Sequence, residues 1–254
     1  MDNRPIGVFD SSVGGIWVLR ELIRLMPNEK YCYLGDTLNA PYGVREESNI
    51  LSLTRDAAHA LLNKDIKALL IACNTATSAA AAPLREELSI PVIGMEPALK
   101  PAAIDWQTGR IAVLATPATL RQKKFQKLFA QYGEHAAAIP CAGLMEFVER
   151  MEFDTPAIES FLTQKLKTDG EPITELVLGC THYVFLRPVL KKVAPQIRLY
   201  DGNRGTALRV QSLLSERDAL CEADQQGAIE LDTTGDRDRI LPVMQKLLNL
   251  PIDI

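Results

Sequence analysis

The sequence predicts an α/β protein made of two similar doubly wound domains, related by pseudo-symmetry, with a cleft between them. Short apolar runs alternate with helical segments along the whole chain of 254 residues, which is typical of parallel sheets covered by helices. An apolar strand that ends in a cysteine, followed by a helix and a further strand, occurs at residues 67–94 and again at 174–201. We expect the two cysteines, Cys73 and Cys180, to face each other across the cleft.

The repeated strands are runs of Leu, Ile and Val bounded by small or polar residues, as expected for fully buried strands. The helices carry apolar residues at helical spacing, and Pro27 with Asn28 ends the first of them. In chain order, the first part of the sequence predicts a strand at 6–9, a helix at 16–26, a strand at 31–34, a helix at 46–63, a strand at 67–72, a helix at 75–88 and a strand at 90–94.

Prolines and polar residues at 96–101 interrupt this pattern, and we expect a crossover between domains there. A chain that finishes near its start would return to its first sheet, so we expect domains at 1–97 plus 208–254 and at 98–207. The rest of the sequence predicts a strand at 110–115, one helix at 117–129, a strand at 136–139, helices at 141–149 and 154–168, a strand at 174–179, a helix at 187–193, a strand at 199–201, a helix at 206–215, a strand at 228–233 and a helix at 240–248.

Composition indicates a cytoplasmic protein with no membrane or nucleic-acid partner. The chain is 47% hydrophobic and 24% charged, with a net charge of −4 and no basic cluster. No apolar run approaches the roughly 18–20 residues that a membrane span requires, and no signal peptide precedes the first strand. The five cysteines are odd in number and include no CxxC, which predicts neither a disulfide framework nor a metal site.

Polar residues follow five of the predicted strands. The carboxyl ends of parallel strands share one edge of a sheet, so these residues are expected to converge on one pocket. Their hydroxyl groups, together with helix N-termini, offer hydrogen-bond donors suited to a carboxylate. The segments are Asp10-Ser11, Asp36 with Pro41-Tyr42-Gly43, Cys73-Asn74-Thr75, Thr116 to Thr119, and Cys180-Thr181-His182.

Two facing thiols suit proton exchange at one carbon atom. One thiolate removes a proton from one face, and the opposite thiol delivers a proton to the other face. Both Cys73 and Cys180 precede predicted helices, whose N-termini are expected to lower the thiol pKa. His182 lies two residues beyond Cys180, and Asp10 is expected near Cys73, which gives each thiol its own partner for proton transfer.

Several of these residues also have a plain structural interpretation. A single cysteine at the end of a buried strand usually serves packing, and only the repeated context favours chemistry for Cys73 and Cys180. Asp10 has the position of a helix cap, and Glu149 that of a solvated helix residue. The remaining cysteines and histidines lack a repeated context and are interpreted as structural: Cys32, Cys141, Cys221, His59 and His135.

Five motifs, in order along the chain, resemble those of the glutamate racemases, which belong to the cofactor-independent aspartate/glutamate racemase superfamily. The resemblance runs from about residue 5 to the end of the chain. The motifs are Gly7-Val8-Phe9-Asp10-Ser11-Ser12-Val13-Gly14-Gly15, Tyr33-Leu34-Gly35-Asp36, Pro41-Tyr42-Gly43, Ala72-Cys73-Asn74-Thr75-Ala76 and Leu178-Gly179-Cys180-Thr181-His182-Tyr183.

The resemblance implies interconversion of L- and D-glutamate, without metal or other cofactor, to supply peptidoglycan synthesis. Cys73 would deprotonate the D-enantiomer with help from Asp10, and Cys180 the L-enantiomer with help from His182, while Glu149 would be a further assisting carboxylate. A homodimer stays open. The implied substrate-binding residues are Asp10, Ser11, Tyr42, Gly43, Asn74, Thr75, Thr116, Thr119, Thr181 and His182.

Two departures from the family pattern stand out, and three rival functions stay open. Ser12 replaces the usual glycine, at a cost of about 1 kcal/mol if that turn needs a positive φ, and residues 140–147 match loosely. The first rival is aspartate racemase or another amino-acid racemase of the superfamily. The second is a hydrolase that uses Cys180 and His182, with Cys73 structural. The third is a binding or regulatory protein that keeps the pocket.

Overall fold

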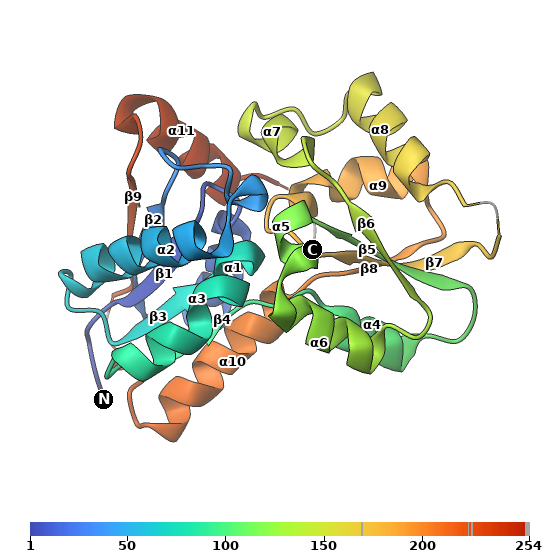
Figure 1. Ribbon diagram of the computed structural model, residues 1–254. Helices are drawn as coiled ribbons and strands as arrows, with labels where there is room; N and C mark the ends of the chain where they lie inside the picture. Colours follow the sequence, from blue (N-terminus) through green and yellow to red (C-terminus); the bar gives the residue numbers. More distant parts are fainter. Residues whose placement is uncertain (169, 223, 225, 252–254) are drawn as a thin grey trace.

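Two parallel sheets form the framework of the structure (Figure 1). The computed structural model describes residues 1–168, 170–222, 224 and 226–251. The first sheet contains β1 (Ile6–Asp10), β2 (Lys30–Gly35), β3 (Ala68–Ile71), β4 (Val92–Gly94) and β9 (Ala228–Thr233). The second sheet contains β5 (Arg110–Ala115), β6 (Ala136–Pro140), β7 (Ile173–Leu178) and β8 (Arg198–Tyr200).

The two sheets repeat one strand order. The first runs β4-β3-β1-β2-β9 and the second β8-β7-β5-β6, so that β1 to β4 correspond to β5 to β8 and β9 extends the first sheet. The neighbouring strands pair in parallel in both sheets. Because β3 and β7 hold equivalent places, the cysteines that follow them do too. The predicted pair of similar α/β units is confirmed.

Helices cover both faces of each sheet (Figure 1). The first lobe comprises the first sheet with α1 (Ile16–Leu25), α10 (Asn203–Glu216) and α11 (Arg237–Leu248) on one face and α2 (Glu47–Leu62) and α3 (Asn74–Glu87) on the other. The second lobe comprises the second sheet with α4 (Leu99–Asp105), α5 (Pro117–Arg121), α6 (Lys123–Tyr132), α7 (Leu144–Glu149), α8 (Pro156–Leu166) and α9 (Arg187–Val193). Two short 3₁₀ helices are η1 (Tyr42–Val44) and η2 (Tyr183–Leu186).

The strand before Cys73 illustrates why the sequence adopts this fold. All four residues of β3 are fully buried, as the unbroken apolar run predicts for a strand covered by helices on both faces. In α1, by contrast, Ile16, Leu19 and Leu22 are buried at helical spacing. Across the described parts of the chain, no helix combines the length and apolarity that crossing a bilayer would require.

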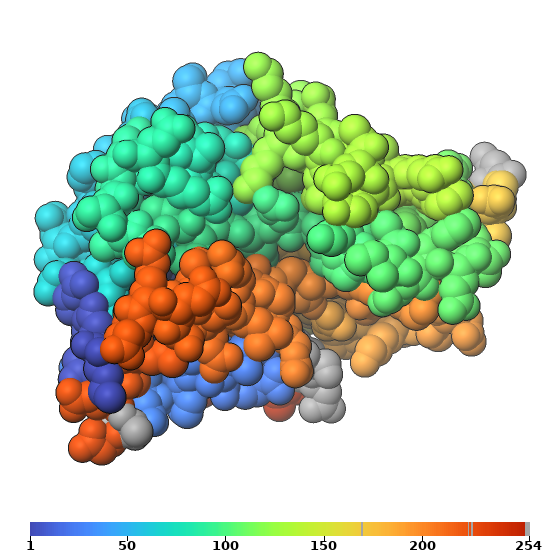
Figure 2. All heavy atoms as spheres, turned by 90° about the horizontal axis from the view of Figure 1, so that it is seen from below, coloured from blue at the N-terminus to red at the C-terminus, as the bar shows by residue number. Residues whose placement is uncertain are grey.

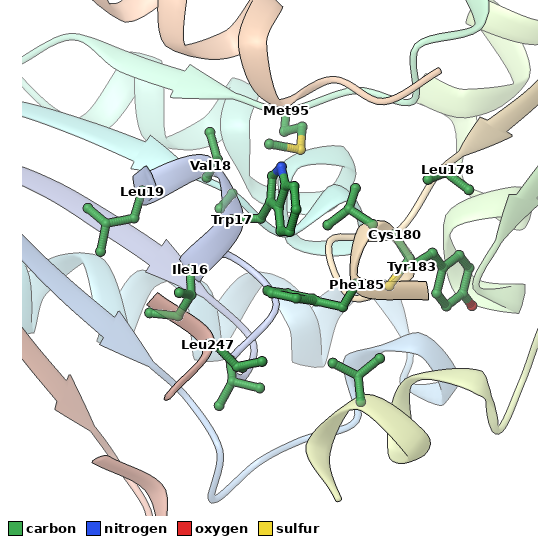
Figure 3. Close-up of a cluster of buried hydrophobic side chains, with 14 of the residues drawn as sticks. Ile16, Trp17, Val18, Leu19, Met95, Leu178, Cys180, Tyr183, Phe185 and Leu247 are labelled. Atoms are coloured by element: carbon green, nitrogen blue, oxygen red, sulfur yellow. The ribbon is translucent and has the colours of Figure 1, made fainter. Parts of the chain in front are cut away.

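One hydrophobic core runs through both lobes. It joins buried residues of β1, α1 and α11 to residues of β7, η2 and α9. At its centre the Trp17 and Phe185 rings meet edge to face, with their centroids 5.2 Å apart. Figure 3 shows Trp17 between Met95 and Phe185, with Cys180 beside the same cluster. The apolar contact between the lobes therefore lies directly next to one of the two repeated cysteines.

After the second lobe the chain returns to the first. Helix α10, orange in Figure 2, lies across the first lobe and packs on α1, and β9 pairs with β2. The segment after α10 is held by Lys67, which donates to the Ala219 carbonyl and pairs with Glu29 at 2.6 Å. The predicted domain limits, 1–97 plus 208–254 and 98–207, stay a prediction. Residues 169, 223, 225 and 252–254 of those ranges lie outside the described residues.

One expectation about secondary structure was incomplete and another was wrong. The predicted crossover at 96–101 contains the start of α4, where Pro101 lies in the first turn and its missing N–H breaks no helical hydrogen bond. The single helix predicted at 117–129 is two helices that are separated at Gln122, which is extended. Helix α5 contacts η1 and α3, whereas α6 packs on α4 as well as on α3, and the break at Gln122 lies between these two sets of contacts.

Candidate active site

The residues at the strand ends of the two lobes meet in one buried region. Thr181, which follows β7, donates a hydrogen bond to Oδ2 of Asp10 at the end of β1, at 3.1 Å. The Thr75 hydroxyl of α3 lies 3.0 Å from the Thr116 hydroxyl that caps α5. Gly43 approaches Thr116 so closely that a Cβ there would lie 2.8 Å from the Thr116 Cβ. The convergence predicted from parallel strands is thus observed, and it joins the two lobes.

Cys73 lies at the junction of β3 and α3. Its Sγ accepts a hydrogen bond from the Ser11 hydroxyl at 3.3 Å and from the Ala76 N–H at 3.4 Å, so the thiol caps α3. Burial nevertheless raises the pKa of the Cys73 thiol to about 12, and the Asp10 carboxylate adds to this rise. The Ser11 and Ala76 donors act in the opposite direction and are outweighed. The helix N-terminus acts on this pKa in the expected direction, but a net lowering was wrong, because burial dominates.

Cys180 belongs to a chain of polar contacts. Its Sγ lies 3.8 Å from His182 Nδ1, and His182 Nε2 lies 3.5 Å from Glu149 Oε1. The same Glu149 oxygen accepts a hydrogen bond from the Ser12 hydroxyl. Burial lowers the pKa of His182, but Cys180 and Glu149 together outweigh burial and hold this pKa well above its ordinary value. The raised pKa favours the protonated form of His182 beside the thiol.

Asp10 is fully buried at the end of β1. Its two oxygens accept hydrogen bonds from the Ser12 N–H, at 2.9 Å, and from Thr181. Burial raises the pKa of Asp10, and the charge of His182 and these two donors reduce the rise without cancelling it. Asp10 also raises the pKa of Cys73 electrostatically, and no direct hydrogen bond between the two is found. Asp10 therefore acts on this thiol through its charge.

Hydroxyl groups and one amide follow Cys73 and reach the second lobe. Thr75, Thr116 and Thr119 form a triangle of hydroxyl contacts of 2.9 to 3.0 Å. Asn74 is buried, and its Oδ1 has no hydrogen-bond partner within the described part of the chain. A buried acceptor without a partner is costly, so Asn74 suits a ligand that brings a donor such as an ammonium group.

The loop after β2 contributes Tyr42 and Gly43. The Tyr42 hydroxyl donates to Asp36 Oδ2 at 2.6 Å, and the Thr234 hydroxyl donates to the other oxygen of the same carboxylate at 2.5 Å. The sequence identified Asp36 only as a polar residue at the end of a strand. Its hydrogen bonds show that the Asp36 carboxylate holds this loop in place. Thr234 was missed, because nothing in its local sequence distinguishes it.

The contacts described above link residues predicted for the site, and Glu149, whose match to the family pattern was loose, lies against His182; their roles stay a prediction. Ser12 and Arg239 were missed as parts of the site, although Ser12 was identified as a departure. Ser12 lies outside the left-handed region of φ, so the strain considered for it is absent. Ser12, Glu149 and Arg239 line a cavity of about 270 Å³, together with Val13, Thr37, Glu146, Arg150, Ile240 and Val243.

Comparison with known proteins identifies the class. The model of the Asp/Glu/Hydantoin racemase family matches residues 27–209. One cysteine follows the equivalent strand of each sheet, and the fold is that of a pseudo-symmetric α/β racemase. The chain belongs to the Asp/Glu/Hydantoin racemase family.

Similar proteins cover nearly the whole chain. A glutamate racemase of Clostridium botulinum is 43% identical over 251 residues, which cover 97% of each chain. The glutamate racemase of Thermus thermophilus, solved with β-chloro-D-alanine, superposes with a TM-score of 0.85 at 34% identity and covers 97% of this chain and 94% of its own. That of Francisella tularensis, solved with D-glutamate, has a TM-score of 0.85 at 27% identity and covers 98% and 95%.

Proposed function

We propose that the protein is a glutamate racemase that interconverts L- and D-glutamate with Cys73 and Cys180 as its two acid–base groups. One observation carries the proposal: the two buried cysteines follow equivalent strands of two sheets with the same order, and hydrogen bonds between polar residues link their surroundings. Cys180 also contributes electrostatically to the raised pKa of Cys73, which supports the proposal that the two thiols act on one substrate. The names of the most similar relatives support glutamate as the substrate.

The proposed reaction moves one proton off the α-carbon and another proton onto it. From D-glutamate, the Cys73 thiolate takes the α-proton and becomes a thiol, while the Cys180 thiol gives its proton to the opposite face and becomes a thiolate. From L-glutamate the roles exchange. Each turnover leaves the two thiols in the opposite protonation states, and proton exchange with solvent or with the partner groups restores them. The reaction uses neither metal nor other cofactor.

The site supports a strong base on the Cys73 side. An α-proton of an amino acid is weakly acidic, and a base with a raised pKa removes it more readily once the base is ionised. The bound substrate would bring a positive ammonium group, which favours ionisation of Cys73. The Ser11 and Ala76 donors would stabilise the resulting thiolate. Asp10, which raises the pKa of this thiol, would strengthen it as a base.

The Cys180 side has a different design. His182, held protonated by Glu149, would stabilise the Cys180 thiolate and return a proton to it. For binding, we assign the ammonium group to Asn74, whose Oδ1 lacks a partner. We assign the carboxylates to the hydroxyl, amide and backbone donors of the remaining residues: Ser11, Tyr42, Gly43, Thr75, Thr116, Thr119 and Thr181. Asp10 and His182 complete the predicted set.

We further infer that the enzyme works in the cytoplasm and supplies D-glutamate for peptidoglycan synthesis. This assignment follows from the proposed activity and from the resemblance to glutamate racemases. The proposal involves a small-molecule substrate and neither nucleic acid nor membrane. A homodimer stays a prediction.

The deciding experiment is incubation of the purified protein with L-glutamate, and separately with D-glutamate, in D₂O without added cofactor. We expect optical activity and the α-proton signal to disappear together from either enantiomer. No exchange with glutamate or aspartate would refute a racemase. Exchange with aspartate alone would assign the site to aspartate racemase.

The Cys73→Ala variant separates the racemase from a hydrolase. A racemase that needs both thiols loses at least about 10³-fold of its activity, as expected when a catalytic proton-transfer group is removed. A hydrolase built on Cys180 and His182 would keep its activity in this variant. Glutamate binding by the wild-type protein, without exchange, would indicate a binding protein.

A further inference from the structure

We propose that Ser12 is a positioning residue: its hydroxyl holds the Glu149 carboxylate against His182 and so couples the first lobe to the proton-transfer chain of Cys180. This inference rests on the proposed racemase function for its meaning in catalysis. Its structural part can be tested without activity.

The backbone of Ser12 is fixed on both sides. Its N–H donates to Asp10 Oδ1 at 2.9 Å, and its carbonyl accepts the Tyr33 hydroxyl at 2.9 Å. The side chain is 1% exposed and lies on the turn between β1 and α1. Its hydroxyl donates to Glu149 Oε1, although 137 residues separate the two along the chain. The donor is therefore presented by a rigid part of the first lobe to a carboxylate of the second.

The Glu149 carboxylate needs such a restraint. It ends a short helix, its side chain is 32% exposed, and it borders the cavity of about 270 Å³. Arg239 of α11 lines the same cavity and attracts this carboxylate. Water and Arg239 thus compete with His182 for Glu149. Ser12 donates to the oxygen atom that lies 3.5 Å from His182 Nε2 and favours the position facing the histidine.

His182 has no substitute for this partner. It is buried, and among the described residues Nε2 has no partner at hydrogen-bond distance and only Glu149 faces this atom within ion-pair distance. Cys180 faces the other ring nitrogen, and the buried Asp10 of β1 also acts on the ring electrostatically. A displaced Glu149 would leave the imidazolium less stable, and His182 would lose its proton at lower pH.

The test is the titration of His182 by NMR with ¹³C-labelled histidine, since the chain contains only three histidines. His182→Asn assigns the resonance. We expect the midpoint to fall in Ser12→Ala and Ser12→Gly by about half to one pH unit, which is a roughly 3- to 10-fold change in the acidity constant. This is less than the direct loss of one hydrogen bond to a charged group, because Ser12 acts on His182 through Glu149. We expect Glu149→Gln to lower it as well.

A double-mutant cycle shows whether Ser12 acts through Glu149. Adding Ser12→Ala to Glu149→Gln is expected to cause no further fall. Ser212→Ala is the matched control, because it removes another serine–glutamate hydrogen bond, to Glu216, at the exposed end of α10. It is expected to leave the midpoint unchanged.

An unchanged or higher midpoint in both Ser12 variants would overturn the proposal, as would an equal fall in the presence of Glu149→Gln. If either variant folds poorly, the other provides the measurement. In the racemase assay we expect a 3- to 10-fold lower kcat with KM within about twofold, matching the shift in acidity. A wild-type protein without racemase activity would refute the proposed function, while the titration would still test the role of Ser12.

Discussion

The Thr181 hydroxyl of the second lobe donates a hydrogen bond to the Asp10 carboxylate of the first lobe, and both residues are almost fully buried. Thr181 directly follows Cys180 in the chain, and Asp10 acts electrostatically on Cys73. The hydrogen bond therefore links the surroundings of the two thiols.

Replacing Thr181 with Val removes this donor at nearly constant volume. The pKa of Asp10 is raised by burial, and Thr181 opposes the rise, so the variant is expected to raise it further. The limb of the pH profile of kcat/KM that reports Asp10 should move to higher pH. We expect a loss of roughly 10- to 100-fold in kcat/KM, from one hydrogen bond to a charged group. Thr181→Ser keeps the donor and should retain most of the activity; equal losses in Ser and Val would refute this role.

Buried thiols should make the protein sensitive to alkali. Burial raises the pKa of Cys73 and of Cys141 to about 12 from the ordinary value of 9.0, so the unfolded chain releases these protons first. The contribution to stability is complete below pH 9 and is lost as the pH rises toward 12. Each thiol should contribute a slope of up to about 1.4 kcal/mol per pH unit in that window.

Urea unfolding of the wild type and of Cys141→Ala, between pH 8 and 10.5, measures the contribution of one thiol. The variant has a constant offset from the lost side chain, so the comparison uses the slopes. We expect the free energy of unfolding to fall less steeply with pH in the variant. Parallel curves would show that Cys141 does not titrate as burial predicts.

Gly43→Ala tests the close approach of the two lobes. The added Cβ would lie 2.8 Å from the Thr116 Cβ, so the loop and α5 must separate. Overpacking of this kind costs about 1–3 kcal/mol, and we expect kcat/KM to fall with a rise in KM. Gly205→Ala in α10 is the control, because its Cβ meets nothing within 4 Å. It should stabilise the protein slightly and leave catalysis unchanged, whereas equal kinetics for the two variants would exclude a steric role for Gly43.

Lys67→Met tests the buried ion pair that holds the end of α10. Lys67 and Glu29 are each 1% exposed and lie 2.6 Å apart. Removing the lysine charge leaves the Glu29 carboxylate buried without a counter-charge, which typically lowers the free energy of unfolding by about 3–5 kcal/mol. We expect a loss of this size in urea unfolding, and partial recovery in the double variant Lys67→Met/Glu29→Gln. No recovery would mean that the loss in stability comes from the missing packing of the lysine side chain and not from the uncompensated Glu29 carboxylate.

The sequence predicted the elements that depend on local pattern. The strands at 110–115 and 228–233 and the helix at 187–193 agree with β5, β9 and α9 at both ends. Elements set by contacts with distant parts of the chain were missed: α4 begins within a proline-rich segment, and the break at Gln122 follows from two different packing partners. Local periodicity carries no information about either.

The site shows the same division. Strand ends of parallel sheets converge by geometry, so Asp10, Cys73 and Cys180 could be grouped from the sequence. The hydrogen bond between Ser12 and Glu149 depends on how the lobes pack, and a spacing of 137 residues gives no hint of it. The pKa of Cys73 depends on how completely the thiol is buried, which the strand pattern did not reveal.

Strand β9 has a consequence for the order in which a newly made chain can fold. The strands of the second lobe are contiguous in sequence, whereas the first sheet is completed only by β9, close to the end of the chain. On the ribosome, β1 to β4 emerge early, and the free edge of β2 has no neighbour until residues 228–233 have been synthesised. An uncovered strand edge is a template for pairing with other chains. The nascent protein is therefore most prone to aggregate while its second lobe is already complete and its last strand is still inside the exit tunnel.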